Sequence, residues 1–78
     1  MQNRPDENSK TILQEVVQGK HESLSYELVN ESGPDHDKNF TVDVHIDGKK
    51  ISSGTGHTKK AAEQQAAYQA LLVLKDKE

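Results

Sequence analysis

The alternation of apolar and polar residues divides the chain after residue 8 into five segments. Over Ser9–Gln18, four apolar residues fall on one side of a helical wheel, which predicts an amphipathic helix. These residues are Ile12, Leu13, Val16 and Val17. Asn8 or Ser9 can cap the start of this helix, and Gly19 is a residue type that tolerates a left-handed end.

Period-two alternation then predicts strands over Leu24–Leu28 and Phe40–Asp47, separated by the loop NESGPDHDKN. The dipeptide Asp47-Gly48 predicts a tight hairpin turn, so Lys49–Ser53 should return as a third antiparallel strand. We expect the strand register to break at Gly54-Thr55-Gly56.

The same alternation assigns side chains to the two faces of the sheet. The residues predicted to face the core are Leu24, Tyr26, Leu28, Phe40, Val42, Val44 and Ile46. Asp43 and Asp47 fall on the opposite face, where we expect them to be solvated.

A second helix is predicted to begin after Thr58, whose hydroxyl can cap it, and to run to about Leu74. Its inner face is rich in alanine, which allows close packing on a sheet. The predicted fold is α+β with the order α-β-β-β-α: a three-stranded antiparallel sheet with both helices packed on one face. We expect one domain over residues 9–76, preceded by a flexible tail or linker remnant over residues 1–8.

Composition bounds the class of protein. A chain of 78 residues without cysteine has room for one small core and no thiolate metal site. No apolar run approaches the length of a membrane span, and no signal segment is present, so we expect a cytoplasmic protein with no membrane partner.

The net charge of −3 argues, taken alone, against a nucleic-acid partner. However, residues 1–37 carry eight acidic and three basic side chains, whereas residues 38–78 carry seven lysines and five acidic side chains. The overall charge therefore hides a positive segment.

Two lysines, Lys59 and Lys60, follow Thr58 at the start of the second helix. Cations are unfavourable beside the positive end of a helix dipole, so a phosphate partner would explain them. Solvated lysines without a partner are the alternative. The spacing of a nucleotide-binding P-loop is absent, and we expect no small-molecule substrate.

The polar side of the first helix carries hydrogen-bonding groups without basic charge: Thr11, Gln14, Glu15 and Gln18. Such groups suit the hydroxyls and base edges of an A-form minor groove, although a solvated helix face has the same pattern. In the long loop, His36 can donate to a hydroxyl while Pro34 fixes the direction of the chain.

Metal and catalytic sites are not predicted. Asp35-x-Asp37-x-Asn39 resembles the start of a calcium loop, but Phe40 stands where that loop needs glycine. The four histidines have no metal-ligand spacing, and no carboxylate cluster is present.

Together these residues resemble the double-stranded-RNA-binding domain. The resemblance rests on Gly54-x-Gly56-x-Thr58-Lys59-Lys60-x-Ala62-Glu63-x-x-Ala66-Ala67-x-x-Ala70-Leu71, on Gly33-Pro34-x-His36, and on Phe40-Thr41-Val42. The chain is most similar to the C-terminal domain of bacterial ribonuclease III, through Lys10-Thr11-x-Leu13-Gln14-Glu15 and the Gly-Pro-Asp-His-Asp-Lys-x-Phe loop.

The resemblance implies that double-stranded RNA is the partner and that A-form shape is recognised with little sequence specificity. The first-helix face would enter one minor groove and the loop with Pro34 and His36 the next, while Thr58, Lys59 and Lys60 would bridge the phosphates between them. It also implies that this segment delivers RNA to a nuclease domain absent from the chain. Catalysis, magnesium and homodimerisation would belong to that domain, leaving this one monomeric and without a cofactor.

Three departures from the family pattern are notable. Glu63 stands where a third basic residue is frequent, Leu24 where a proline often precedes the first strand, and His57 where small residues are frequent. His57 either adds a phosphate contact at low pH or is simply exposed. A stand-alone RNA-binding or protein-interaction module of the same fold is the alternative function.

Overall fold

A computed structural model describes residues 8–76 of the chain. Two helices flank three strands in the order α1 (Ser9–Gly19), β1 (Leu24–Ser32), β2 (Asn39–Ile46), β3 (Lys49–Gly56) and α2 (Lys59–Asp76). The tail predicted over residues 1–8 therefore falls, except for Asn8, outside the described residues.

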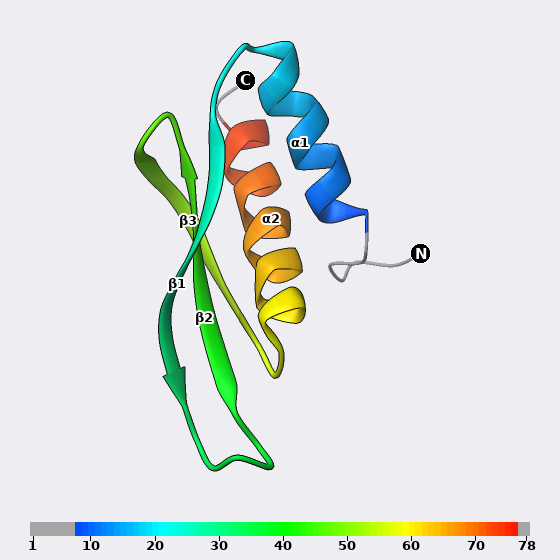
Figure 1. Ribbon diagram of the computed structural model, residues 1–78. Coiled ribbons are helices and arrows are strands. Elements are labelled where there is room, and N and C mark those ends of the chain that lie inside the picture. The colour runs from blue at the N-terminus through cyan, green and yellow to red at the C-terminus, as the bar shows by residue number, and fades with distance from the viewer. Residues whose placement is uncertain (1–7, 77–78) are drawn as a thin grey trace.

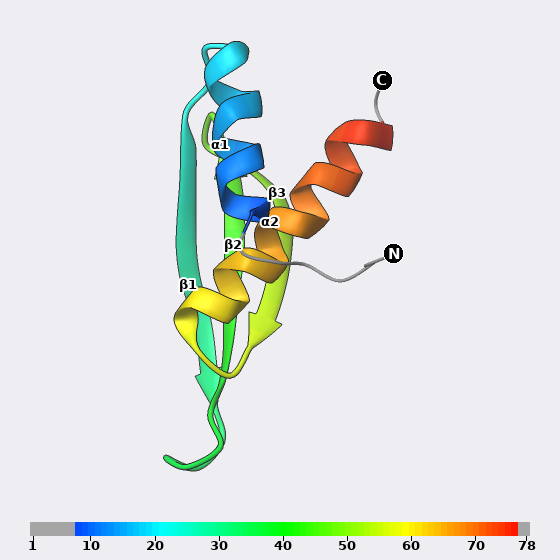
Figure 2. The ribbon, with the colours of Figure 1, turned by 90° about the vertical axis from the view of Figure 1, so that its right-hand side faces the viewer.

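The strands form one antiparallel sheet in the order β1-β2-β3. Both helices lie against the same face of this sheet, and the other face is left open (Figures 1 and 2). The predicted α+β architecture is confirmed.

The core lies between the sheet and the helices. It combines large aliphatic side chains of α1 and β2 with small side chains of α2, and its members are Leu13, Val17, Val42, Val44, Ile46, Ala62, Ala66, Ala67 and Ala70. Tyr26 and Phe40 pack against this core and are half-buried. Because four alanines form its inner face, α2 can approach the sheet closely.

Gly54 marks the closest approach of α2 to the sheet. A Cβ atom on Gly54 would lie 2.2 Å from the backbone nitrogen of Ala66, and the hydroxyl of Ser52 donates a 2.7 Å hydrogen bond to the Ala66 carbonyl. The predicted break at residues 54–56 is wrong, because Val42 pairs with Gly54 and Phe40 with Gly56. These glycines make room for the helix and do not end the strand.

The prediction for the end of α1 is also wrong. Gly19 is the last helical residue, and the left-handed position belongs to His21, with φ of 58°. The amide of Glu22 donates to the Val17 carbonyl and that of His21 to the Gln18 carbonyl, which is the Schellman arrangement. At the other end of α1, Asn8 occupies the N-cap position without a side-chain capping hydrogen bond.

The hairpin between β2 and β3 has the predicted turn, since Asp47 and Gly48 both have positive φ, at 54° and 81°. Asp47 is exposed as expected, but Asp43 is buried, contrary to prediction. Asp43 faces Glu27 and Ser53 across the sheet, and the ammonium group of Lys50 lies 3.6 Å from its carboxylate. The neighbouring strands and a cation therefore replace the water that we expected around it.

Strand β1 is longer than predicted and continues to Ser32. Its register shifts between Leu28 and Asn30, which marks a β-bulge. The side chain of Leu28 lies just before this bulge and is exposed, although the alternation placed it in the core.

Candidate functional site

The outer face of α1 presents the four polar side chains predicted from the sequence. Thr11, Gln14, Glu15 and Gln18 are all exposed. The first three share an open hollow with Lys10 and Tyr26, where α1 meets β1. This surface offers hydrogen-bond donors and acceptors beside one cation.

The start of α2 combines free amides with two lysines. Thr58 caps the helix, because its hydroxyl accepts a 3.0 Å hydrogen bond from the amide of Ala61. Lys59 and Lys60 are the first two helical residues, both are exposed, and neither forms an ion pair within residues 8–76. The helix dipole and both ammonium groups therefore add positive potential at one point.

The loop between β1 and β2 folds into a turn around His36. The amide of Asp37 donates a 2.9 Å hydrogen bond to the Pro34 carbonyl, and Gly33 enters the turn with φ of 95°. A side chain on Gly33 would also meet the Asp37 carbonyl oxygen at 2.5 Å. The tight turn leaves Pro34 and His36 exposed at its tip.

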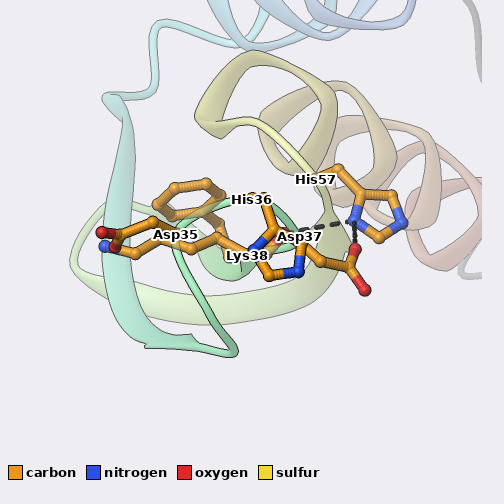
Figure 3. A pocket seen from close by; sticks show the side chains of 6 residues that line it. Asp35, His36, Asp37, Lys38 and His57 are labelled. Carbon is orange, nitrogen blue, oxygen red and sulfur yellow. Dashed lines mark hydrogen bonds and ion pairs between the residues drawn. The ribbon is translucent and has the colours of Figure 1, made fainter.

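His57 connects this loop to the start of α2. Its Nδ1 lies 3.1 Å from the carbonyl oxygen of Lys38 and 3.5 Å from Oδ1 of Asp37 (Figure 3). Because a carbonyl oxygen only accepts, Nδ1 carries the proton in this arrangement. His57 is thus 72% exposed but engaged with the loop, a role that neither of the two sequence-based interpretations included.

An ion pair that the sequence did not predict joins α1 to α2. The ammonium group of Lys10 lies 2.6 Å from Oε1 of Glu63 and 5.3 Å from the centre of the Tyr26 ring. The backbone amide of Lys10 also donates to the side chain of Gln64, at 3.2 Å. Lys10 and Glu63 are 53 positions apart, so no local pattern could have paired them.

Tyr26 is affected by this junction. Burial, and secondly the nearby carboxylate of Glu63, raise the pKa of Tyr26 to about 12. Its hydroxyl is buried without a hydrogen-bond partner in residues 8–76. The phenol therefore stays neutral at any physiological pH.

The three predicted contact surfaces follow one another along the domain. In Figure 2, α1 is uppermost, the first turn of α2 lies below it, and the β1–β2 loop is at the bottom. The nine residues predicted from sequence, which we call the candidate interface, are Thr11, Gln14, Glu15, Gln18, Pro34, His36, Thr58, Lys59 and Lys60. Cationic groups thus lie between two surfaces without net positive charge.

Other sites are not evident in the described part of the chain. No group of three His, Asp or Glu residues between positions 8 and 76 is placed to hold a metal ion. None of the helices in that range is both long and apolar enough to cross a membrane.

Known proteins are similar to this chain in sequence and in fold. Ribonuclease 3 of Desulforamulus reducens is 53% identical over 68 residues, which are 86% of this chain and 28% of that protein. Ribonuclease 3 of Pediococcus pentosaceus is 52% identical over 67 residues, 85% of this chain and 29% of that protein. The chain therefore spans less than a third of these curated relatives.

Among solved structures, the first double-stranded RNA-binding domain of HYL1 superposes with a TM-score of 0.68 at 38% identity, covering 85% of this chain and 94% of that one. The second such domain of DRB4 gives a TM-score of 0.63 at 38% identity, covering 86% and 94%. The family model of the double-stranded RNA binding motif matches residues 9–74. The chain belongs to the double-stranded RNA binding motif family.

Proposed function

We propose that this domain binds double-stranded RNA through its A-form shape, as the RNA-binding part of a ribonuclease III. The observation that carries the proposal is the order of the three surfaces, with the first turn of α2, which begins with Lys59 and Lys60, between α1 and the β1–β2 loop. A-form RNA presents the same order: a shallow minor groove, a major groove lined by phosphates, and the next minor groove.

Each surface has the chemistry for its groove. The hydroxyl, amide and carboxylate groups of α1 can exchange hydrogen bonds with 2′-hydroxyls and base edges, which carry no net charge. His36 projects from a loop that its turn and His57 hold in place. The lysines and free amides of α2 match phosphates in charge, and this surface carries no acidic residue in the first helical turn.

The ribonuclease III part of the proposal comes from curated relatives that are named Ribonuclease 3, such as those of Desulforamulus reducens and Pediococcus pentosaceus. In this proposal the domain holds the duplex, while magnesium and the cleaving carboxylates belong to a nuclease region outside these 78 residues. The domain itself is then a binding module without catalytic activity or cofactor.

Gel-shift titration with RNA and DNA duplexes of one sequence tests the binding proposal. The domain should bind a 20-bp RNA duplex, bind the DNA duplex much more weakly, and lose affinity for RNA below about 16 bp. Affinity should fall steeply with salt, since phosphate contacts release counterions. Equal affinity for DNA, or no binding by a folded domain, would disprove it.

The ribonuclease III assignment has a separate test. The longer protein that contains this domain should cleave duplex RNA in the presence of magnesium. Replacing Lys59 and Lys60 by alanine there should raise the RNA concentration needed for half-maximal cleavage more than it lowers the rate at saturating RNA. An unchanged concentration dependence would separate this domain from substrate binding.

A further inference from the structure

Lys10 lies at a junction of three elements. Its ammonium group contacts Glu63 of α2 at 2.6 Å and lies over the ring of Tyr26 in β1, while its backbone amide donates to Gln64 of α2. Within residues 8–76, the Lys10–Glu63 pair is the one ion pair that joins the two helices. It is partly buried, with side chains 35% and 25% exposed.

Both ends of this pair adjoin the candidate interface. Lys10 directly precedes Thr11, the first residue of the α1 surface. Glu63 lies one helical turn beyond Lys59 and Lys60, so its carboxylate is on the same side of α2 as the lysines. A shift of either helix at this junction would therefore change the spacing between the minor-groove surface and the phosphate surface.

Glu63 also matters through its charge. Glu63 lies four residues after Lys59 and three residues after Lys60. At these spacings on a helix, a carboxylate is normally placed to pair with a lysine. Here it pairs with Lys10, and within residues 8–76 Lys59 and Lys60 have no acidic partner. The pair thus occupies an acidic group that would otherwise compete with phosphate for these two lysines.

Resting on the RNA-binding function proposed above, we propose that Lys10 and Glu63 are positioning residues for RNA recognition. Their ion pair sets the spacing of α1 and α2 to that of the RNA grooves and withholds Glu63 from Lys59 and Lys60. Neither residue needs to contact RNA for this role.

The substitution Glu63→Gln gives opposite results under the two explanations. If Glu63 acts only as a negative charge near phosphates, its removal strengthens RNA binding. If the ion pair positions the helices, the same change weakens binding about 3- to 10-fold. Glu27→Gln is the matched control, since it removes the same charge from a carboxylate that lies 3.2 Å from His45 on the far face of the sheet, and it should not weaken binding.

A double-mutant cycle with Lys10→Gln separates positioning from direct contact. Under our proposal Lys10→Gln weakens binding more than Glu63→Gln, because the freed Glu63 can then pair with Lys59. The double variant should bind no more weakly than Lys10→Gln alone. If Lys10 contacts phosphate instead, the two effects add with opposite signs, and Lys10→Gln lowers the salt dependence by about one counterion.

Thermal melting must accompany these titrations. A partly exposed ion pair contributes little to stability, so each variant should melt within about 5 °C of the wild type. Melting lowered by more than about 15 °C would assign the pair to stability and overturn the proposal. Wild-type protein that fails to bind RNA disproves the function proposed above, whereas unchanged or tighter binding by Glu63→Gln disproves this inference alone.

Discussion

The outer face of the sheet and the candidate interface both carry charged side chains, but they use them differently. On the outer face, Lys50 pairs with Asp43 and His45 lies 3.2 Å from the carboxylate of Glu27. At the candidate interface, Lys59 and Lys60 have no acidic partner within the described residues. The outer face pairs its lysine with a carboxylate, and the candidate interface leaves its lysines available.

This contrast explains how a chain of net charge −3 can offer a surface to a polyanion. Exposed charges act mainly within about one Debye length, roughly 10 Å at moderate salt. The position of the unpaired lysines therefore matters more than the total charge. Four variants would break or sharpen the contrast, in decreasing order of expected effect.

The largest effect should come from Gly54→Ala, which prevents α2 from packing on the sheet. Unfolding of the domain would then abolish both the outer face of the sheet and the candidate interface. The new methyl group would lie 2.2 Å from the backbone of Ala66, which cannot move without displacing the helix. We expect a loss of about 3 kcal/mol or more in the free energy of unfolding, measured by urea denaturation. Gly19→Ala is the control, because nothing lies within 4 Å of that position, and it should be neutral or slightly stabilising.

The second effect tests the unpaired cations directly. Replacing Lys59 and Lys60 by alanine should weaken RNA-duplex binding about 10- to 100-fold and reduce the salt dependence by about two counterions, with little change in melting temperature. The matched control replaces Lys49 and Lys50, at the far end of the sheet, by alanine. If both double variants lose the same affinity, the two surfaces do not differ as we infer.

The third effect concerns the paired cation of the outer face. Lys50→Met leaves the Asp43 carboxylate, 11% exposed, without its cation. We expect the domain to lose about 0.5–1 kcal/mol of stability, since the Lys50 side chain is itself largely exposed. RNA affinity measured by gel shift should stay within about twofold of the wild type. A larger loss of affinity than of stability would contradict the contrast.

The smallest effect is expected from a comparison of two buried polar groups: Asp43, which has a partner, and the Tyr26 hydroxyl, which has none among the described residues. Tyr26→Phe removes that hydroxyl and should leave stability at neutral pH unchanged or raised by less than about 1 kcal/mol. A clear loss would show that the hydroxyl has a stabilising partner.

The same variant has a pH signature. The pKa of Tyr26 is about 12 in the folded state against 10.0 for an ordinary tyrosine. The unfolded chain therefore ionises first, and this residue's contribution to stability is lost as pH rises from about 10 to 12. The melting temperature of wild type should therefore fall relative to that of Tyr26→Phe in that window, so that the two curves diverge, and parallel curves would contradict the pKa shift.

Sequence reasoning identified most of the fold because the signals were local. The alternation around Val42 and Val44, the Asp47-Gly48 turn and the Thr58 cap each depend on neighbours a few residues away. The errors arose where tertiary packing decided the outcome. Gly54 was interpreted as a break in the strand register. Glycine is needed there because the backbone of Ala66, on α2, leaves no room for a side chain, and no local pattern shows that contact.

The candidate site shows the same division between features with a local sequence signal and features that depend on tertiary contacts. Thr11, His36 and Lys59 were identified through a motif with fixed spacing, and all three are exposed in the structure. The contacts that hold the surfaces in place, through Lys10 and His57, join residues from distant segments. No periodicity or motif in one sequence marks such pairs.

The candidate interface draws on both ends of the described chain, because α1 and α2 are its first and last elements and pack against each other. Strands joined by short turns can pair early, whereas contacts between terminal helices carry a larger loop-closure cost. An opening that releases α1 alone, measurable by amide hydrogen exchange, would abolish the three-surface arrangement while leaving the hairpin intact. Bound RNA should therefore slow exchange in α1 beyond the residues that it touches, since binding selects the fully assembled state.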